Sequence, residues 1–218
     1  MIMKSPRSIN VLIAYEESQS ECTAFLQAGC NAFSCDLQEC SGNHPERHIV
    51  GDVRQLFIPG FECTTQTGVQ LITPKWDLII AHPPCTYLSR AASAYLYPGH
   101  KLNAERYEKG LKAAQFFMEM YNAPAHFVCV ENPTPFRIFN LPSPSCVVNP
   151  CDLGSPWLKR TLYWLRNLPP LIYGTYYPNA RSYVYYTKGG KKRSKSFDCI
   201  SKAMAEQWIP IIKDYIMQ

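Results

Sequence analysis

Two reactive side chains each follow an apolar run that is typical of a buried strand. Cys85 ends residues 76–85 (WDLIIAHPPC), and Glu131 ends residues 127–131 (FVCVE). In a doubly wound α/β sheet the carboxyl ends of the strands share one crevice, so we expect the thiol and the carboxyl group to face the same pocket. A nucleophilic thiol beside a proton-donating carboxyl group is suited to attack on a pyrimidine ring.

Each of these residues also has a structural interpretation. Cys85 could be a buried thiol that behaves as a small hydrophobe. Pro83 and Pro84 favour the nucleophile instead, because they fix φ and remove backbone donors, which holds the next residue in a rigid turn. Glu131 could be satisfied by loop amides, but apolar surroundings would let it donate a proton near neutral pH. Asn132 could brace the loop.

The elements that must position these residues alternate between strand and helix. Apolar runs predict strands at 10–14, 32–36, 49–53, 77–82, 127–131, 160–165 and 183–186, and periodic patterns predict helices at 18–29, 103–121 and 201–217. Ser18 or Ser20 could cap the first helix, and Ser201 the last. The order indicates a doubly wound, mostly parallel α/β sheet. We expect one domain over residues 1–218, with a proline-rich loop at 133–158 and a short basic insert at 172–196.

The first strand-to-helix turn, residues 14–20 (AYEESQS), contains no glycine. A dinucleotide pyrophosphate needs a glycine-rich turn, and Glu16 and Glu17 would repel phosphate. The ligand expected here lacks phosphate, and S-adenosylmethionine, with its adenosine, ammonium and sulfonium groups, fits. Asp36 ends the second predicted strand, where a carboxylate commonly binds ribose hydroxyls. Asp52 could accept from an adenine amino group or cap a helix.

The composition is that of an ordinary soluble protein, with 46% hydrophobic and 18% charged residues among 218. No apolar run approaches the length of a membrane span. The first residues lead into a strand pattern rather than a signal peptide, so we expect a cytoplasmic protein without membrane contact. The ten cysteines are then reduced thiols. Cys40, His44 and His48 fit no standard zinc spacing, so we expect no metal.

The net charge of +5 permits a nucleic-acid partner without requiring one. The basic residues gather near the carboxyl terminus, at Lys188, Lys191, Lys192, Arg193 and Lys195. This cluster is either a solvated loop or a set of phosphate contacts.

Taken in order, these segments resemble the motifs of the DNA cytosine-5 methyltransferases. The matching segments are 14–20 with 28–29 (first cofactor loop), Asp36 (ribose acid), 51–53 (GDV, adenine contact), 83–85 (PPC, nucleophile loop), 131–133 (ENP, for Glu-Asn-Val) and 159–161 (KRT, arginine strand). The chain looks still more like the short phage and prophage proteins labelled DNA cytosine methyltransferase. That pattern appears as 16–19 (EESQ), 34–37 (SCDL), 81–89 (AHPPCTYLS) and 203–208 (AMAEQW).

The resemblance implies a Rossmann-like fold of the S-adenosylmethionine-dependent methyltransferase type and a definite mechanism. Cys85 adds to C6 of cytosine, Glu131 protonates or hydrogen-bonds N3, and C5 takes the methyl group of S-adenosylmethionine. Arg160 would hold the base's O2, and Asn132 would brace the loop. The base must leave the stack or be single-stranded. Tyr87 and Tyr95 could stack on nucleotides or serve in ordinary packing.

The resemblance also implies three groups of site residues. The catalytic group is Cys85, Glu131, Asn132 and Arg160. The cofactor group is Tyr15, Glu16, Ser18, Asp36, Leu37, Asp52, Val53, His82 and Pro83. The nucleic-acid group is Tyr87, Ser89, Arg90, Lys191, Lys192, Arg193 and Lys195. The implied partner is DNA, in a bacterial or phage-infected cell.

Three departures from the family widen the alternatives. The Phe-x-Gly-x-Gly-Gly loop is absent, and only Arg160 remains of the Gln-x-Arg-x-Arg strand. The insert at 172–196 stands where the family has a much larger target-recognition domain. We therefore expect relaxed specificity, or readout by a specificity subunit or a second copy of the chain.

Two other functions remain open. An adenine-N6 methyltransferase would use an Asp/Asn-Pro-Pro-aromatic loop. Here His82 and Cys85 take the polar and aromatic places, and Cys cannot stack on a base. A non-catalytic module that binds nucleic acid or S-adenosylmethionine would explain the missing glycines, but the presence of Cys85 and Glu131 opposes it.

Overall fold

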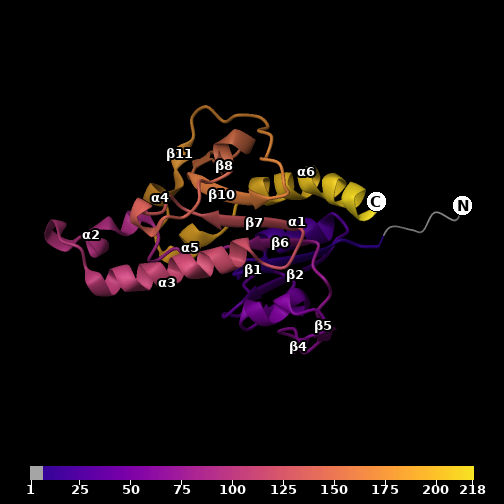
Figure 1. Ribbon diagram of the computed structural model, residues 1–218. Coiled ribbons are helices and arrows are strands. Elements are labelled where there is room, and N and C mark those ends of the chain that lie inside the picture. The colour runs from indigo at the N-terminus through magenta and orange to yellow at the C-terminus, as the bar shows by residue number, and fades with distance from the viewer. Residues whose placement is uncertain (1–6) are drawn as a thin grey trace, which may run out of the picture.

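A seven-stranded sheet forms the centre of the computed structural model, which describes residues 7–218 (Figure 1). In sheet order the strands are β3 (His48–Val50), β2 (Asn31–Asp36), β1 (Asn10–Ala14), β6 (Leu78–Ala81), β7 (Phe127–Asn132), β10 (Thr161–Arg166) and β8 (Cys146–Val148). The first five are parallel, and β10 is antiparallel to both β7 and β8. The strand order follows the Rossmann-like order, with β10, the last strand of the sheet along the chain, inserted between β7 and β8. The predicted doubly wound, mostly parallel α/β fold is confirmed.

Helices cover both faces of this sheet, with α1 (Ser20–Gln27) and α6 (Asp198–Ile216) on one face and α3 (Ala104–Tyr121) on the other. The shorter helices are α2 (Ser93–Leu96), α4 (Tyr183–Tyr186) and α5 (Gly190–Ser194). Short 3-10 turns lie at Pro45–Arg47, Val53–Phe57, Arg90–Ala92, Pro98–His100, Arg137–Phe139 and Pro150–Leu153. Two small sheets add β4 (Glu62–Thr64) with β5 (Gln70–Ile72), and β9 (Trp157–Leu158) with β11 (Arg181–Ser182). Among the helices of residues 7–218, none combines the length and apolarity needed to cross a bilayer.

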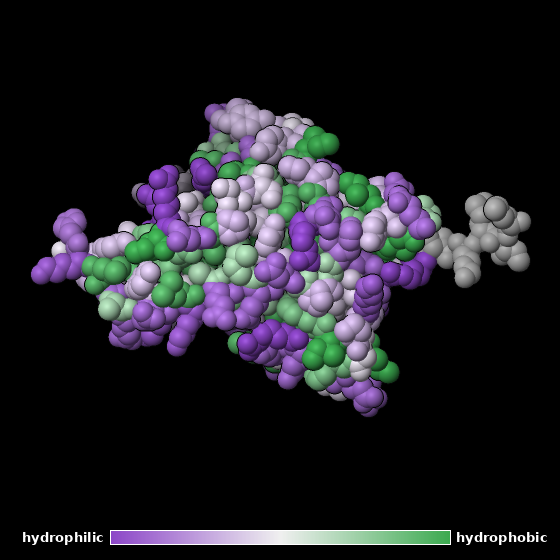
Figure 2. Space-filling view, in the orientation of Figure 1, coloured by the Kyte–Doolittle hydropathy of each residue, from purple (hydrophilic) through white to green (hydrophobic). Residues whose placement is uncertain are grey.

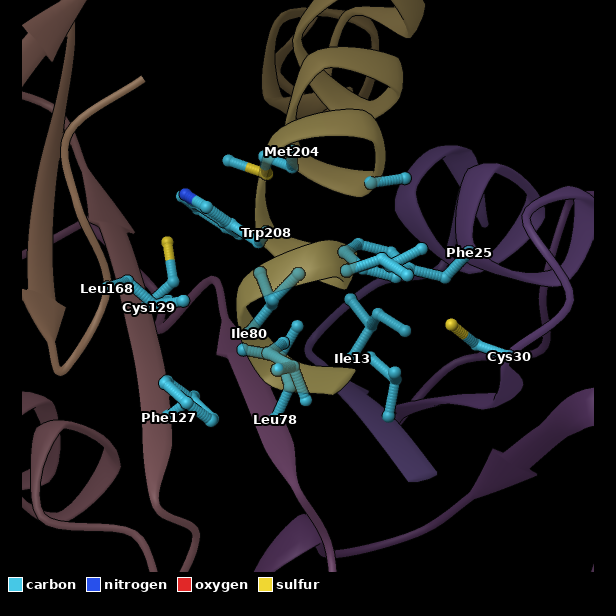
Figure 3. Packing of buried hydrophobic residues seen from close by; sticks show 14 of the residues in the cluster. Ile13, Phe25, Cys30, Leu78, Ile80, Phe127, Cys129, Leu168, Met204 and Trp208 are labelled. Carbon is cyan, nitrogen blue, oxygen red and sulfur yellow. The ribbon is translucent and has the colours of Figure 1, made fainter. Parts of the chain in front are cut away.

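Alternating side chains of the strands divide the core into two layers. On one face Ile13 and Ile80 pack with Phe25 of α1 and with Met204 and Trp208 of α6 (Figure 3). The opposite face packs against α3, whose buried residues are Gly110, Ala114, Phe117 and Met120. The outward side of α3 is mostly hydrophilic, as expected for an amphipathic helix (Figure 2). Because side chains alternate along a strand, one set of residues at the β6 and β7 strands shares the face that α1 covers, namely 78, 80 and 82, and 127, 129 and 131.

Several predicted elements differ from the structure. Residues 183–186 form the single helical turn α4 instead of a strand, because β11 pairs with β9 only through Arg181 and Ser182 and leaves the next backbone groups to bond locally. Helix α6 begins at Asp198, so Ser201 lies inside its first turn and donates to the Phe197 carbonyl instead of capping the helix. The proline-rich loop at 133–158 contains β8 and β9, and the β4–β5 hairpin was not predicted.

Candidate active site

Two loops at the carboxyl ends of β6 and β7 carry the candidate nucleophile and acid. The strands are parallel neighbours in register, with Ala81 opposite Val130. His82 directly follows β6, and Glu131 lies in the last part of β7, so the two side chains meet at one edge of the sheet. Cys85 lies three residues beyond His82 and is half-buried. The sheet thus brings the predicted thiol and carboxyl group to the same edge, where the charge of Glu131 acts on the Cys85 thiol.

Hydrogen bonds join the two loops along their length. Asn132, which is 1% exposed, donates from Nδ2 to the Pro83 carbonyl at 2.9 Å, the bracing contact expected for it. The Arg90 N–H donates to the Thr134 carbonyl, and the Phe136 N–H donates to the Leu88 carbonyl, both at 2.9 Å. These bonds fix the loop that carries Cys85 against the loop that follows Glu131.

The surroundings of Glu131 are not the apolar ones expected from the sequence. His82 Nδ1 lies 3.2 Å from Glu131 Oε2, and His82 Nε2 lies 3.4 Å from Glu21 Oε1 of helix α1. The side chain of His82 is 12% exposed and that of Glu21 is fully buried. Burial in itself lowers the pKa of His82, but Glu21 and Glu131 raise it to about 10. His82 is therefore an imidazolium between two carboxyl groups at neutral pH.

Glu16, predicted to contact the cofactor, is turned into the protein. Tyr15 and Gln19 have positive φ values of 62° and 59° and bend the chain so that Glu16 covers the start of α1. Its carboxyl group accepts from the Glu21 N–H at 2.5 Å and the Cys22 N–H at 3.1 Å. This capping replaces the one expected of Ser18 or Ser20. Burial, together with the charge of Glu21, raises the pKa of Glu16 well above its ordinary value.

Glu21 is the residue of this group that the sequence did not single out. Burial would raise its pKa, but the positive charge of His82, whose Nε2 lies 3.4 Å from Glu21 Oε1, lowers it overall. Glu21 is thus the buried anion beside the His82 imidazolium. Glutamates are common in the first turn of a helix because they stabilise the positive end of the helix dipole. The sequence alone therefore did not mark Glu21 as a site residue.

The remaining cofactor candidates divide into two groups. Tyr15 follows β1 and Asp36 ends the neighbouring β2, and burial, then the charge of Asp52, raises the pKa of Tyr15. Asp36 is half-buried and accepts from the Gln38 N–H, and the neighbouring Leu37 is 67% exposed. These side chains could hold an adenosine. Pro83 is buried and contributes its carbonyl to Asn132.

Other cofactor candidates are occupied by structural contacts. Asp52 accepts from the Arg54 N–H and caps the 3-10 turn Val53–Phe57, the second of its two predicted roles. Val53, which was predicted to bind the cofactor, is 1% exposed and packs in the core, so its side chain is covered by other residues. Ser18 lies 3.4 Å from the Ser20 hydroxyl, in a hollow of about 630 Å³ between α1 and α6. His48 uses its two ring nitrogens on Ser34 and the Gln38 carbonyl, which leaves none for a metal.

Lys159 is the cation whose charge acts on Cys85, while Arg160 was predicted to hold the base's O2. Burial raises the pKa of the Cys85 thiol and Glu131 raises it further, while Lys159 lowers it. Arg160 is exposed just before β10. Lys159 also donates to the Lys195 carbonyl at 3.4 Å and lies 5.7 Å from the Phe197 ring centroid. The basic segment thereby reaches the neighbourhood of the nucleophile.

Replacing Lys159 by methionine should slow alkylation of Cys85 by iodoacetamide at pH 8. Because burial and the charge of Glu131 raise the pKa of the Cys85 thiol, only a small thiolate fraction reacts at pH 8, and the rate rises with pH. Loss of the cation raises this pKa further, so we expect the pH 8 rate to fall about twofold to fivefold, as for a charge pair worth roughly 0.5–1 kcal/mol. Mass spectrometry of the Cys85 peptide measures the rate. Lys202→Met on α6 is the control, and an unchanged pH profile in Lys159→Met would contradict the assignment.

The predicted nucleic-acid residues have mixed surroundings. The guanidinium of Arg106, on α3, lies 4.9 Å from the Tyr87 ring centroid and 5.2 Å from that of Tyr95, and it donates to the Thr86 carbonyl at 2.7 Å. Arg106 was not predicted, and it fixes the loop after Cys85. Ser89 is buried and caps Arg90–Ala92, so it is not available to a nucleic acid.

The predicted phosphate contacts are on the surface. Arg90, Lys192, Arg193 and Lys195 are exposed. The Arg193 guanidinium donates to the Thr187 carbonyl at 2.6 Å, and Lys195 Nζ lies 3.4 Å from the Ser41 hydroxyl. The side chain of Lys191 is outside the part of the chain that the structure describes. These four exposed side chains can contact phosphate without any movement of core residues.

Comparison with known proteins finds similarity among solved structures, at low sequence identity in the example described below. No family model and no curated protein matches the sequence. A prophage-encoded E. coli chain, provisionally described as a DNA modification methyltransferase, is similar at 17% identity with a TM-score of 0.43. The match covers 72% of this chain and 46% of that chain, so this chain spans less than half the length of its neighbour. A similarity this distant carries no argument about the chemistry.

Proposed function

We propose that this protein transfers a methyl group from S-adenosylmethionine to C5 of cytosine in DNA through a covalent adduct of Cys85. One observation carries the proposal: Cys85 and Glu131 lie on two hydrogen-bonded loops at the same edge of the sheet. A thiol and a carboxyl group in this arrangement can attack a pyrimidine and protonate it in one site.

The chain's own residues account for most of the steps. The Cys85 thiolate bonds to C6 while Glu131 delivers a proton to N3, so the electrons of the C5–C6 double bond become available at C5. S-adenosylmethionine supplies the methyl group that C5 takes up. Loss of the C5 proton to a base then restores the double bond and breaks the Cys85–C6 bond. The nucleophile must be a thiolate, and Lys159 favours that form.

The binding residues that we propose follow from their positions. Tyr15, Asp36 and Leu37, at the ends of β1 and β2, would hold the adenosine of S-adenosylmethionine, with Asp36 on the ribose. The exposed cations Lys192, Arg193 and Lys195 would bind the DNA backbone. We infer that sequence readout needs a specificity subunit or a second copy of the chain, and that the protein acts in the cytoplasm of a bacterial or phage-infected cell.

Methyl transfer from labelled S-adenosylmethionine to single- and double-stranded DNA tests this function. We expect label in 5-methylcytosine after nuclease digestion, and in the strand form that the site accepts. Label in N6-methyladenine would replace cytosine chemistry with the amino-methyltransferase alternative. Cofactor binding without transfer to either form would instead support a non-catalytic module.

A further inference from the structure

His82 is a buried ionisable side chain to which the proposed mechanism assigns no step. We propose that His82 is a positioning residue that supplies Glu131 with the proton for ring nitrogen N3, acting across the 3.2 Å contact between His82 Nδ1 and Glu131 Oε2. This inference rests on the proposed function. It adds a third participant to the pair of residues that the sequence identified.

The strand pattern explains why His82 and Glu131 meet. His82 continues the series Leu78 and Ile80, and Glu131 continues Phe127 and Cys129, so both point to the face that α1 covers. Helix α1 contributes Glu21 from its first turn to the same place. Three ionisable side chains from three elements therefore converge at the carboxyl edge of the sheet.

The charges around His82 favour its protonated form. Its Nε2 lies 3.4 Å from the fully buried carboxylate of Glu21, and its Nδ1 faces Glu131. Burial raises the pKa values of Tyr163 on β10 and Cys129 on β7 well above their ordinary values, so these two neighbours add no charge at neutral pH, and burial also raises the pKa of Glu16. The His82 imidazolium thus has the Glu21 carboxylate as a counter-ion beside Nε2, and Glu131, with which it can exchange a proton, beside Nδ1.

Two proton transfers make up the step. The proton on His82 Nδ1 moves to Glu131, and Glu131 passes a proton to N3 as Cys85 Sγ bonds to C6. The negative charge of the thiolate and the added proton cancel in the adduct. His82 is left as a neutral imidazole whose Nε2–H faces Glu21. When a base removes the C5 proton and the Cys85–C6 bond breaks, the N3 proton returns through Glu131 to His82, so His82 and Glu131 regain their starting protonation states.

Replacing His82 by asparagine separates a structural role from proton supply. The Asn side-chain amide keeps an N–H donor near the place of Nδ1 but has no proton to give up. We expect His82→Asn and His82→Ala to lower kcat for methyl transfer similarly, by about 10²-fold, in line with the contribution of a general acid. His126→Asn, an exposed residue just before β7, is the matched control with wild-type activity. Full rescue by Asn would overturn the proposal.

Imidazole NMR of the five histidines gives a readout that does not depend on activity. The His82 signals, assigned by their loss in His82→Asn, should remain those of an imidazolium at pH 8 and should titrate at lower pH in Glu131→Gln. A neutral His82 at pH 8, or a titration unchanged by Glu131→Gln, would overturn the link between the two residues. If the wild-type protein shows the expected titration but transfers no methyl group, the proposed function is refuted, while the contact between His82 and Glu131 is still supported.

Discussion

Cys85→Ala is expected to abolish methyl transfer to cytosine while S-adenosylmethionine still binds. Without the thiol no bond to C6 can form, and the chain places no other thiol in the loops that surround Glu131 among residues 82–90 and 131–136. The substitution removes one sulfur from a half-buried loop position, so the fold should persist. Transfer of labelled methyl groups to DNA and equilibrium binding of the cofactor measure the two properties separately.

The covalent adduct itself can be tested with DNA that carries 5-fluorocytosine. A base cannot remove fluorine from C5 as it removes a proton, so the elimination that frees Cys85 is blocked. The wild-type protein should therefore remain bonded to the DNA and migrate as a complex in denaturing gels. Cys85→Ala should form no such complex. Cys63→Ala, in the β4–β5 hairpin, is the matched control and should form it normally. A complex formed by Cys85→Ala would show that another residue is the nucleophile.

Glu131→Gln should lower kcat by about 10²- to 10⁴-fold, the usual contribution of a positioned general acid. Glutamine keeps the shape of the side chain and can still meet His82, but it cannot carry a proton to N3. Binding of S-adenosylmethionine should be unaffected, since the proposed adenosine contacts lie on β1 and β2. Single-turnover methyl transfer at saturating DNA measures the effect on chemistry apart from product release.

A surface substitution supplies the comparison for Glu131→Gln. Glu206 is exposed on α6 and lies 3.7 Å from Lys202, and exposed pairs of this kind contribute little. Glu206→Gln should therefore retain full activity. If Glu131→Gln retained more than a tenth of the wild-type kcat, Glu131 would be a structural carboxylate, the other interpretation that its sequence position allows.

The strands were predictable because buried parallel strands are continuous apolar runs. The predicted ranges 10–14 and 127–131 differ from β1 and β7 by no more than one residue at either end. The meeting of Cys85 and Glu131 at one edge follows from the rule that parallel strands end at the same side. The β4–β5 hairpin was missed because its residues are exposed or only half-buried and show no apolar pattern.

The contacts of the site were less predictable than its location. Glu21 and Arg106 act on the site from helices α1 and α3, and only the packing of those helices on the sheet brings them close to His82 and Tyr87. The same packing turns Glu16 inward, although its sequence neighbours place it in a ligand-binding turn. Such contacts depend on helix placement, which local residue patterns do not encode.

The hydrogen bonds between the two loops have a consequence for how a base is received. Asn132 is hydrogen-bonded to the Pro83 carbonyl, and backbone hydrogen bonds continue at Thr134 and Leu88. The two loops therefore form a single rigid unit beyond the ends of β6 and β7. Because neither loop can move without the other, the distance between the Cys85 thiol and the Glu131 carboxyl group is set before the substrate binds. The entropy of aligning these groups is then already lost during folding and need not be lost again in the reaction.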